Sequence, residues 1–353
     1  MMSLFLEPLD VWLFRDGRPF DAQSDHRAAS LFPPYPSLLQ GVIRSQQLVV
    51  QGVDLTDTQA IRQAVGDAED YGRLRLRGGW IARCGADDSA ITRYFALPAD
   101  LVAHDDRLVT LQPTKVPVGQ LCNAVTEWLL VSPVPPQKEM PGEWLAEGEL
   151  LKYLRGETPS ATPSKKLFVR ESRLGIGRDD ERRVTREAVL YEVEFIRPQP
   201  GVGLYVEVEG YDWPETGTLR IGGEGRASLY RKLDRRPEWP LVSLPSPLPP
   251  RFKVYFATPA CFERGWLPRD WNAFFTAPVE LATAALARYE SLGGYDWAHN
   301  RHKDARRYVP AGSVYYFVNP RGAALRPDLI QNAITDAGAE IGFGQILITE
   351  WKE

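Results

Sequence analysis

The stretch SLFPPYPSLLQGVIRSQQL, residues 30–48, predicts where the first helix of the chain begins. Its three prolines exclude a helix before Pro36, because proline lacks an N–H group and restricts the residue before it. Ser37 is expected to be the N-cap, and the apolar residues that follow share one helical face. Gly41 inside this helix costs about 1 kcal/mol relative to alanine, so we expect another backbone to approach it closely.

Strand-like segments lie on both sides of this helix. Residues 4–14, LFLEPLDVWLF, come first, and the Asp-Gly turn signal of residues 15–18, RDGR, follows them. Residues 73–83, RLRLRGGWIAR, alternate basic and apolar side chains, which predicts a strand with one basic face. Residues 167–196 hold LFVRESRLGIG and AVLYEVEFI, which predict a long hairpin with its tip at residues 177–181.

The rest of the chain predicts an insertion, a linker and an α+β tail. Residues 132–166 are rich in Pro, Glu and Lys and predict an irregular insertion with one short helix near 143–154. Residues 234–251 hold six prolines and are the best linker candidate. Beyond them we expect strands separated by helices at 279–290 and from Pro327 onward, an order that suggests a ferredoxin-like unit.

Composition limits the class of protein. A chain of 353 residues predicts about two domains. A net charge of −4 argues against a protein coated in basic charge that binds nucleic acid indiscriminately. The three cysteines lie far apart and form no CxxC pair, and no leader or membrane-spanning stretch is evident, so a reduced, cytoplasmic protein is expected.

Two basic clusters are candidate phosphate contacts. Eight Lys or Arg and four acidic residues lie between Lys165 and Arg186, so arginines would line the predicted hairpin. The run at 301–307, RHKDARR, is flanked by Trp297 and Tyr308, a mixture that suits single-stranded RNA. In both places an ordinary solvated charged surface remains an alternative.

A Gly-rich loop is a third candidate. Residues 221–226, IGGEGR, would let the backbone approach a phosphate, with Gly223 expected at positive φ. Residues 342–345, GFGQ, are a weaker copy, and neither matches a P-loop because no GK[ST] follows. A simple turn is the alternative for both.

Histidine offers little for catalysis or metal binding. His299 and His302 have HxxH spacing with Asp304 nearby, but no third ligand is evident and the neighbouring Arg301 and Lys303 repel a cation. His26 could be a general base, but Ser24 and Asp25 are too close in sequence to complete a positioned triad alone. No metal or other cofactor is therefore expected.

An ordered set of motifs also carries a family resemblance. The motifs are FRDGRPF (14–20), SLFPPYPSLLQGVIRS (30–45), LRLRGGW (74–80), ESRLGIGRDDERRVTREAVLYEVEFIRP (171–198), LRIGGEGR (219–226), VPAGSVYYF (309–317) and GFGQILI (342–348). Together they resemble the third-subunit family of the type III-B CRISPR Cmr complex, part of the RAMP superfamily, over nearly the whole chain.

The resemblance implies an α+β fold of two ferredoxin-like (RRM-type) domains with an inserted β-hairpin thumb. On this chain the N-terminal domain would span 1–235, with insertions at about 132–166 and the thumb at about 167–196. A Pro-rich linker, 236–251, would lead to a C-terminal domain at 252–353.

The resemblance further implies a non-catalytic subunit that binds the repeat-derived 5′ handle of a guide RNA. Its protein partners would be the large polymerase/cyclase-like Cmr subunit and a backbone RAMP subunit, with no membrane contact. The candidate RNA-binding residues are Arg15, Arg18, Ser37, Arg44, Arg170, Arg173, Arg178, Gly222, Gly223 and Arg226. One departure from the family pattern is that Ala227-Ser228-Leu229-Tyr230, not further glycines, follow the first pair.

Three other functions remain open at this point. A RAMP-type endoribonuclease that processes guide RNA would use His26 as general base, with Arg27 beside it. A metal-dependent hydrolase would use His299 and His302. A pure scaffold would make no RNA contact.

Overall fold

The structure, a computed structural model, describes residues 1–352 apart from 16–26, 68–69, 86–89, 118–125, 179–184, 240–245 and 297–300. The described residues form a mixed α/β structure, mostly strands, with three α-helices. They divide into two compact units. Unit 1 comprises Met1–Ile91, Lys165–Arg236 and Ser291–Arg306, and unit 2 comprises Thr92–Ser164, Pro237–Glu290 and Arg307–Glu353.

Unit 1 is built on an antiparallel sheet with strands in the order β13, β14, β1, β12, β3. Its elements are β1 (Met2–Pro8), β2 (Arg27–Ala28), α1 (Pro36–Gln51), α2 (Thr58–Val65), β3 (Arg75–Cys84), β10 (Phe168–Arg178), β11 (Thr185–Pro198), β12 (Val202–Glu209), β13 (Thr216–Arg220) and β14 (Ala227–Lys232). The hairpin β17 (Glu290–Asp296) and β18 (Arg301–Tyr308) lies mostly in unit 1.

Helix α1 begins at Pro36, as the prolines predict, but its N-cap is Tyr35. The prediction of Ser37 as N-cap is therefore wrong: Pro36 takes the first helical position, where its missing N–H is not needed, and exposed Ser37 lies inside the first turn. The close approach expected at Gly41 is also absent, since a Cβ there would meet no heavy atom within 4 Å.

The close approach occurs instead on β3, at Gly78 and Gly79. Both have positive φ, and the register with β12 shifts there, from Tyr205 opposite Trp80 to Val206 opposite Gly78. A Cβ on Gly79 would lie 2.5 Å from Cδ1 of Leu39 on α1. The glycine pair thus makes a β-bulge that lets the helix pack closely on the sheet.

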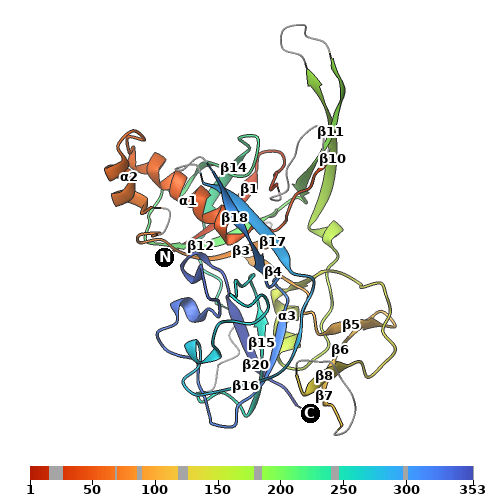
Figure 1. Cartoon of the computed structure of the whole chain (residues 1–353). Coiled ribbons are helices and arrows are strands. Elements are labelled where there is room, and N and C mark those ends of the chain that lie inside the picture. Colours follow the sequence, from red (N-terminus) through yellow and green to blue (C-terminus); the bar gives the residue numbers. More distant parts are fainter. Residues whose placement is uncertain are drawn as a thin grey trace. The chain divides into compact units, whose positions relative to one another are not determined.

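Strands β10 and β11 form a long two-stranded ribbon, drawn in green in Figure 1. Pairing runs from Phe168 opposite Pro198 to Arg178 opposite Thr185. The short strand β2 pairs with β11 in parallel, and the bridge between Trp12 and Ile196 adds a further contact. A small core lies at the base of the ribbon, formed by Val11, Leu13, Ala28, Val193 and Phe195.

Unit 2 contains a four-stranded sheet in the order β16, β19, β15, β20. Its strands are β4 (Ile91–Ala96), β5 (Leu101–His104), β6 (Arg107–Thr110), β7 (Gln112–Lys115), β8 (Trp128–Val131), β9 (Trp144–Ala146), β15 (Arg251–Phe256), β16 (Glu280–Ala285), β19 (Val314–Val318) and β20 (Ile346–Glu350), with α3 at Glu147–Leu154. Strand β4 pairs with β9, β5 with β6, and β7 with β8.

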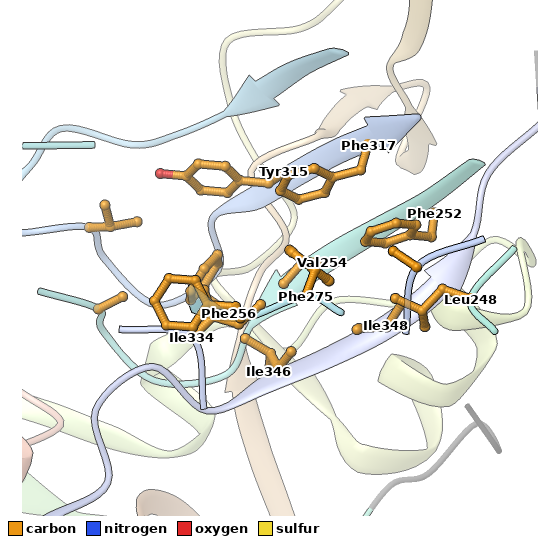
Figure 2. Packing of buried hydrophobic residues seen from close by; sticks show 14 of the residues in the cluster. Leu248, Phe252, Val254, Phe256, Phe275, Tyr315, Phe317, Ile334, Ile346 and Ile348 are labelled. Carbon is orange, nitrogen blue, oxygen red and sulfur yellow. The ribbon is translucent and has the colours of Figure 1, made fainter. Parts of the chain in front are cut away.

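One face of the four-stranded sheet carries an aromatic-rich core, shown in Figure 2. Phe252 and Phe256 from β15 pack there with Tyr315 and Phe317 from β19, and Ile348 comes from β20. These alternate residues share a face because side chains alternate along a strand.

A buried polar network lies around Asp100 in unit 2. Tyr153, Tyr316 and Lys253 each donate a hydrogen bond to its carboxylate, at 2.7, 2.5 and 2.9 Å. The ammonium of Lys253 also donates to the hydroxyl of Tyr153, at 2.8 Å. Burial, followed by the nearby Asp100 charge, raises the pKa of Tyr153 well above its usual range, so its hydroxyl stays neutral.

Two helices expected in the tail are not formed. Residues 279–290 contain strand β16, because pairing with β19 and burial of Ala282 override the helical preference of an Ala-rich segment. After Pro327 the only helices of the described residues are two short 3-10 helices, Ile330–Asn332 and Ala339–Ile341, and Gln331 and Asn332 of the first have positive φ. The other short 3-10 helices are Ser164–Lys166 and Trp271–Ala273.

No helix in the described part of the chain is both long and apolar enough to cross a membrane.

Candidate nucleic-acid interface

Three arginines from separate segments of unit 1 gather around one carboxylate, that of Asp10. Arg173 on β10 lies 3.2 Å from it, Arg197 on β11 lies 3.0 Å from it, and Arg226 beside the Gly-rich loop lies 3.6 Å from it. The three side chains are 26–41% exposed. We call these arginines, with Asp10, Glu171 and Glu224, the arginine cluster.

Inside this cluster, four side chains close a ring of alternating charge. Glu171 binds Arg173 at 2.6 Å through one carboxylate oxygen and Arg197 at 2.6 Å through the other. Since both arginines also bind Asp10, each guanidinium lies between the same two carboxylates. Arg226 is outside the ring and pairs with Glu224 at 3.1 Å.

The ring keeps both carboxylates ionised. The hydrogen bond from Arg173 is the main reason that the pKa of Asp10 is below its ordinary value, with Arg197 adding to it. The hydrogen bond from Arg197, and then that from Arg173, lowers the pKa of Glu171. The ring therefore holds two cations and two anions at neutral pH.

The ring of Phe195 orients two of the guanidinium groups. Arg173 and Arg226 each lie 4.8 Å from the centre of this buried ring, within the range of a cation–π contact. Phe195 itself is fixed in the core at the base of the ribbon. Arg173 of the hairpin and Arg226 of the Gly-rich loop are thereby held close together over the same ring.

Arg170 lies nearby on β10 and is also paired. Its guanidinium binds the carboxylate of Glu194 at 2.5 Å and donates to the carbonyl of Ser30 at 2.7 Å. Its side chain is 44% exposed, so part of the charge faces solvent.

The Gly-rich loop joins β13 to β14. Gly222 has φ +85°, and a Cβ on it would lie 2.4 Å from the carbonyl oxygen of Leu13. The N–H of Gly223 donates to that same carbonyl at 2.8 Å. The expectation of positive φ at Gly223 is wrong, because that conformation is taken by Gly222, Glu224 and Gly225.

Arg44 makes contacts within its own region. Its guanidinium donates to the carbonyl of Asp67 at 2.7 Å and to the side chain of Gln40 at 3.2 Å. It also lies 5.8 Å from the centre of the Tyr71 ring. The structure thus gives Arg44 a part in holding α1 to the segment after α2.

The remaining candidate residues are spread along unit 1. Arg15 is exposed and forms a backbone bridge with Ser30. Ser37 is exposed on α1. Arg178 lies on β10 opposite Thr185, although its side chain is not described, and Arg18 lies outside the described residues.

Sequence reasoning missed Asp10, Arg197 and Phe195. A signal for Arg197 existed in the hairpin, because the register pairs Glu171 with Phe195 and Val169 with Arg197. Arg197 is therefore the diagonal neighbour of Glu171, within reach of a long side chain. Nothing in the sequence connects Asp10 to the hairpin.

The structure does not test the histidines considered as alternatives. His26 and His299 lie outside the described residues, and the side chain of His302 is not described. Within the described ranges, no group of three His, Cys, Asp or Glu side chains could hold a metal ion.

Comparison with known proteins gives one family and a set of similar folds. The family model described as "CRISPR-associated protein (Cas_Cmr3)" matches residues 4–351. No curated protein matches the sequence.

Two similar solved structures belong to one type of assembly. A chain of the type III-B Cmr-beta complex bound to cognate target RNA has a TM-score of 0.53 and 14% identity, covering 99% of each chain. A chain of the same complex bound to cognate target RNA and AMPPnP has a TM-score of 0.53 and 14% identity, covering 98% of each chain. At this identity the similarity shows the fold.

Proposed function

This chain belongs to the Cas_Cmr3 family of CRISPR-associated proteins, and on that premise we propose that it binds the 5′ handle of the guide RNA. It would do so as a non-catalytic subunit of a type III-B Cmr effector complex. The observation that carries the proposal is the arginine cluster, where the hairpin and the Gly-rich loop bring three guanidinium groups around Asp10.

The chemistry of the cluster suits a phosphate backbone. A guanidinium presents a planar set of donors that matches two oxygens of a phosphate. Arg173, Arg197 and Arg226 present three such sets, each partly exposed. Arg170, 44% exposed on the same strand as Arg173, would extend the surface along the hairpin.

Charge balance supports binding to one defined RNA end. The cluster holds as many acidic as basic groups, and the whole chain has a net charge of −4. Such a surface attracts a generic polyanion weakly, because non-specific nucleic-acid binding depends on excess positive charge.

The proposed architecture is two ferredoxin-like domains with β10 and β11 as the thumb. In unit 1, four neighbouring strands of the sheet follow the order β14, β1, β12, β3. Numbered one to four along the chain, these strands have the spatial order 4-1-3-2. In unit 2 the strands β20, β15, β19 and β16 repeat this order. That order is the one of a ferredoxin-like sheet, which supports the proposal.

The proposed protein partners are the large polymerase/cyclase-like Cmr subunit and a backbone RAMP subunit. Support comes from family membership and from the fold shared with chains of the Cmr-beta complex. We also propose a cytoplasmic location for this assembly.

The division of the chain at the Pro-rich segment 236–251 stays a prediction, since residues 240–245 are outside the described set.

Filter binding of the purified full chain to handle RNA tests the proposal. Arg173→Ala and Arg226→Ala should each weaken binding about tenfold, because a hydrogen bond between charged groups contributes roughly 1.5–3 kcal/mol. The matched control is Arg326→Ala, which removes an arginine paired with Asp328 in unit 2. If both cluster variants melt normally and bind as tightly as the parent across a salt series, the site is not at the cluster.

A further inference from the structure

The acidic members of the cluster are placed where they would compete with a phosphate. Arg173 and Arg197 each have two anionic partners, Asp10 and Glu171, at 2.6–3.2 Å. In this ring the Nε and Nη2 groups of each arginine bind the carboxylates: Nε donates to Glu171 and Nη2 donates to Asp10. An incoming phosphate that binds the Nε/Nη2 edge of either arginine must therefore displace a carboxylate.

We infer that Asp10 and Glu171 are built-in competitors of the guide RNA, so that RNA binding is an exchange of carboxylate for phosphate. The inference rests on the proposed function, because it assigns roles within the same site. Asp10 is the principal competitor, since it is within 3.6 Å of all three arginines whereas Glu171 pairs with two.

Exposure makes this exchange feasible. Asp10 is 46% exposed and Glu171 is 30% exposed, so water reaches both carboxylates after they leave the arginines. Ion pairs between partly exposed side chains contribute little net free energy, because each charge is nearly as well solvated alone. The ring thus lowers the affinity for RNA but does not prevent RNA from binding.

The consequence is that an RNA is retained only if its contacts with the subunit outweigh the cost of displacing the carboxylates. The exchange is the same step for any RNA, so it weakens every RNA by the same factor. An RNA that contacts only phosphate-binding arginines then binds too weakly to stay, whereas one that makes further contacts is still retained. The two carboxylates thereby keep the free subunit from being occupied by unrelated RNA.

The test compares Asp10→Asn and Glu171→Gln with the parent chain. Both replacements keep the shape of the side chain and remove its charge. The probes are the handle RNA and an oligouridylate of equal length, each measured by filter binding across a salt series. Asp328→Asn is the matched control, because it removes the same charge from an arginine-paired, exposed aspartate in unit 2.

We expect Asp10→Asn to tighten binding of both RNAs by about three- to tenfold at low salt. The dependence on salt should become steeper, since more uncompensated cations meet the RNA. Glu171→Gln should act in the same direction. Asp328→Asn should leave both affinities within twofold of the parent.

Two results would overturn the inference. One is that both cluster variants, with normal melting, bind RNA as weakly as the parent or more weakly, which would make the carboxylates positioning groups for the arginines. The other is an equal gain from Asp328→Asn, which would make any tightening an effect of net charge. Because the arginine variants test the site itself, loss of binding in Arg173→Ala without gain in Asp10→Asn contradicts this inference alone.

Discussion

At the scale of single residues, Gly222 decides the geometry of the Gly-rich loop. Its φ of +85° and the 2.4 Å gap between its Cβ position and the Leu13 carbonyl leave no room for a side chain. Its neighbour Gly223 uses its N–H on the same carbonyl and has an ordinary φ. The turn therefore requires glycine at 222, whereas residue 223 anchors the loop through a backbone N–H that any residue except proline has.

Gly222→Val should destabilise the protein by about 1–3 kcal/mol through backbone strain alone, with steric overlap adding to it. Gly223→Val is the matched control and should cost less, because φ at residue 223 is ordinary and its Cβ would meet the side chain of Leu13 at 3.1 Å and the Leu13 carbonyl oxygen only at 3.7 Å. Urea unfolding of the two variants measures the difference. Equal stability of both would contradict this account of the loop.

Residue types could be predicted from the sequence better than their partners. The hairpin arginines and the Gly-rich loop were identified from local pattern, and the structure brings Arg173 and Arg226 together. The role of Asp10 could not be predicted, because its contacts depend on how β10 and β11 pair and where the chain before β2 crosses them. Arg44 shows the same limit, since a helix pattern does not reveal the carbonyl of Asp67 beside it.

At the scale of elements, local signals decided some boundaries and distant pairing decided others. The prolines predicted the start of α1 because their effect is steric and local. Residues 279–290 have a helical pattern, yet strand β16 forms there. It pairs with β19 through backbone hydrogen bonds and buries side chains on one face. The strand order in each sheet involves segments far apart in sequence, which no local pattern specifies.

Gly41→Ala should stabilise the protein by roughly 0.5–1 kcal/mol, because alanine loses less backbone entropy in a helix and nothing lies within 4 Å of the new methyl group. Thermal or urea unfolding measures the change. Gly148→Ala in α3 is the comparison, since its Cβ position is equally open but lies in the first turn. A fall in stability for Gly41→Ala would show that the helix is packed more tightly than the structure indicates.

At the scale of the whole molecule, the family of the protein could be predicted from the ordered sequence motifs but not from composition. The ordered motifs run from residue 14 to residue 348 and pointed to one family, which the match over residues 4–351 confirms. Composition excluded a generally basic protein and could not say which local surface is used. A net charge of −4 is compatible with the neutral cluster because specificity needs placement of charge more than its total.

The lack of catalysis is a prediction for the assembled complex. His26→Ala should leave target-RNA cleavage by the complex within about threefold, because the sequence offers no convincing acid/base pair beside it. Cleavage assays on complexes with parent and variant subunits, matched for assembly, measure this. A tenfold loss with intact assembly would contradict the prediction that this subunit is non-catalytic.

Four buried tyrosines of unit 2, two of them in the polar network around Asp100, allow unfolding at high pH to be followed by absorbance. Burial raises the pKa of Tyr255, Tyr315 and Tyr316, as it does that of Tyr153, so these phenols ionise only when the fold opens. A folded-state pKa above the unfolded value means that stability is complete below about pH 10 and declines as pH rises beyond it. Alkaline unfolding should therefore release a cooperative burst of tyrosinate absorbance, separate from the gradual titration of exposed tyrosines such as Tyr289.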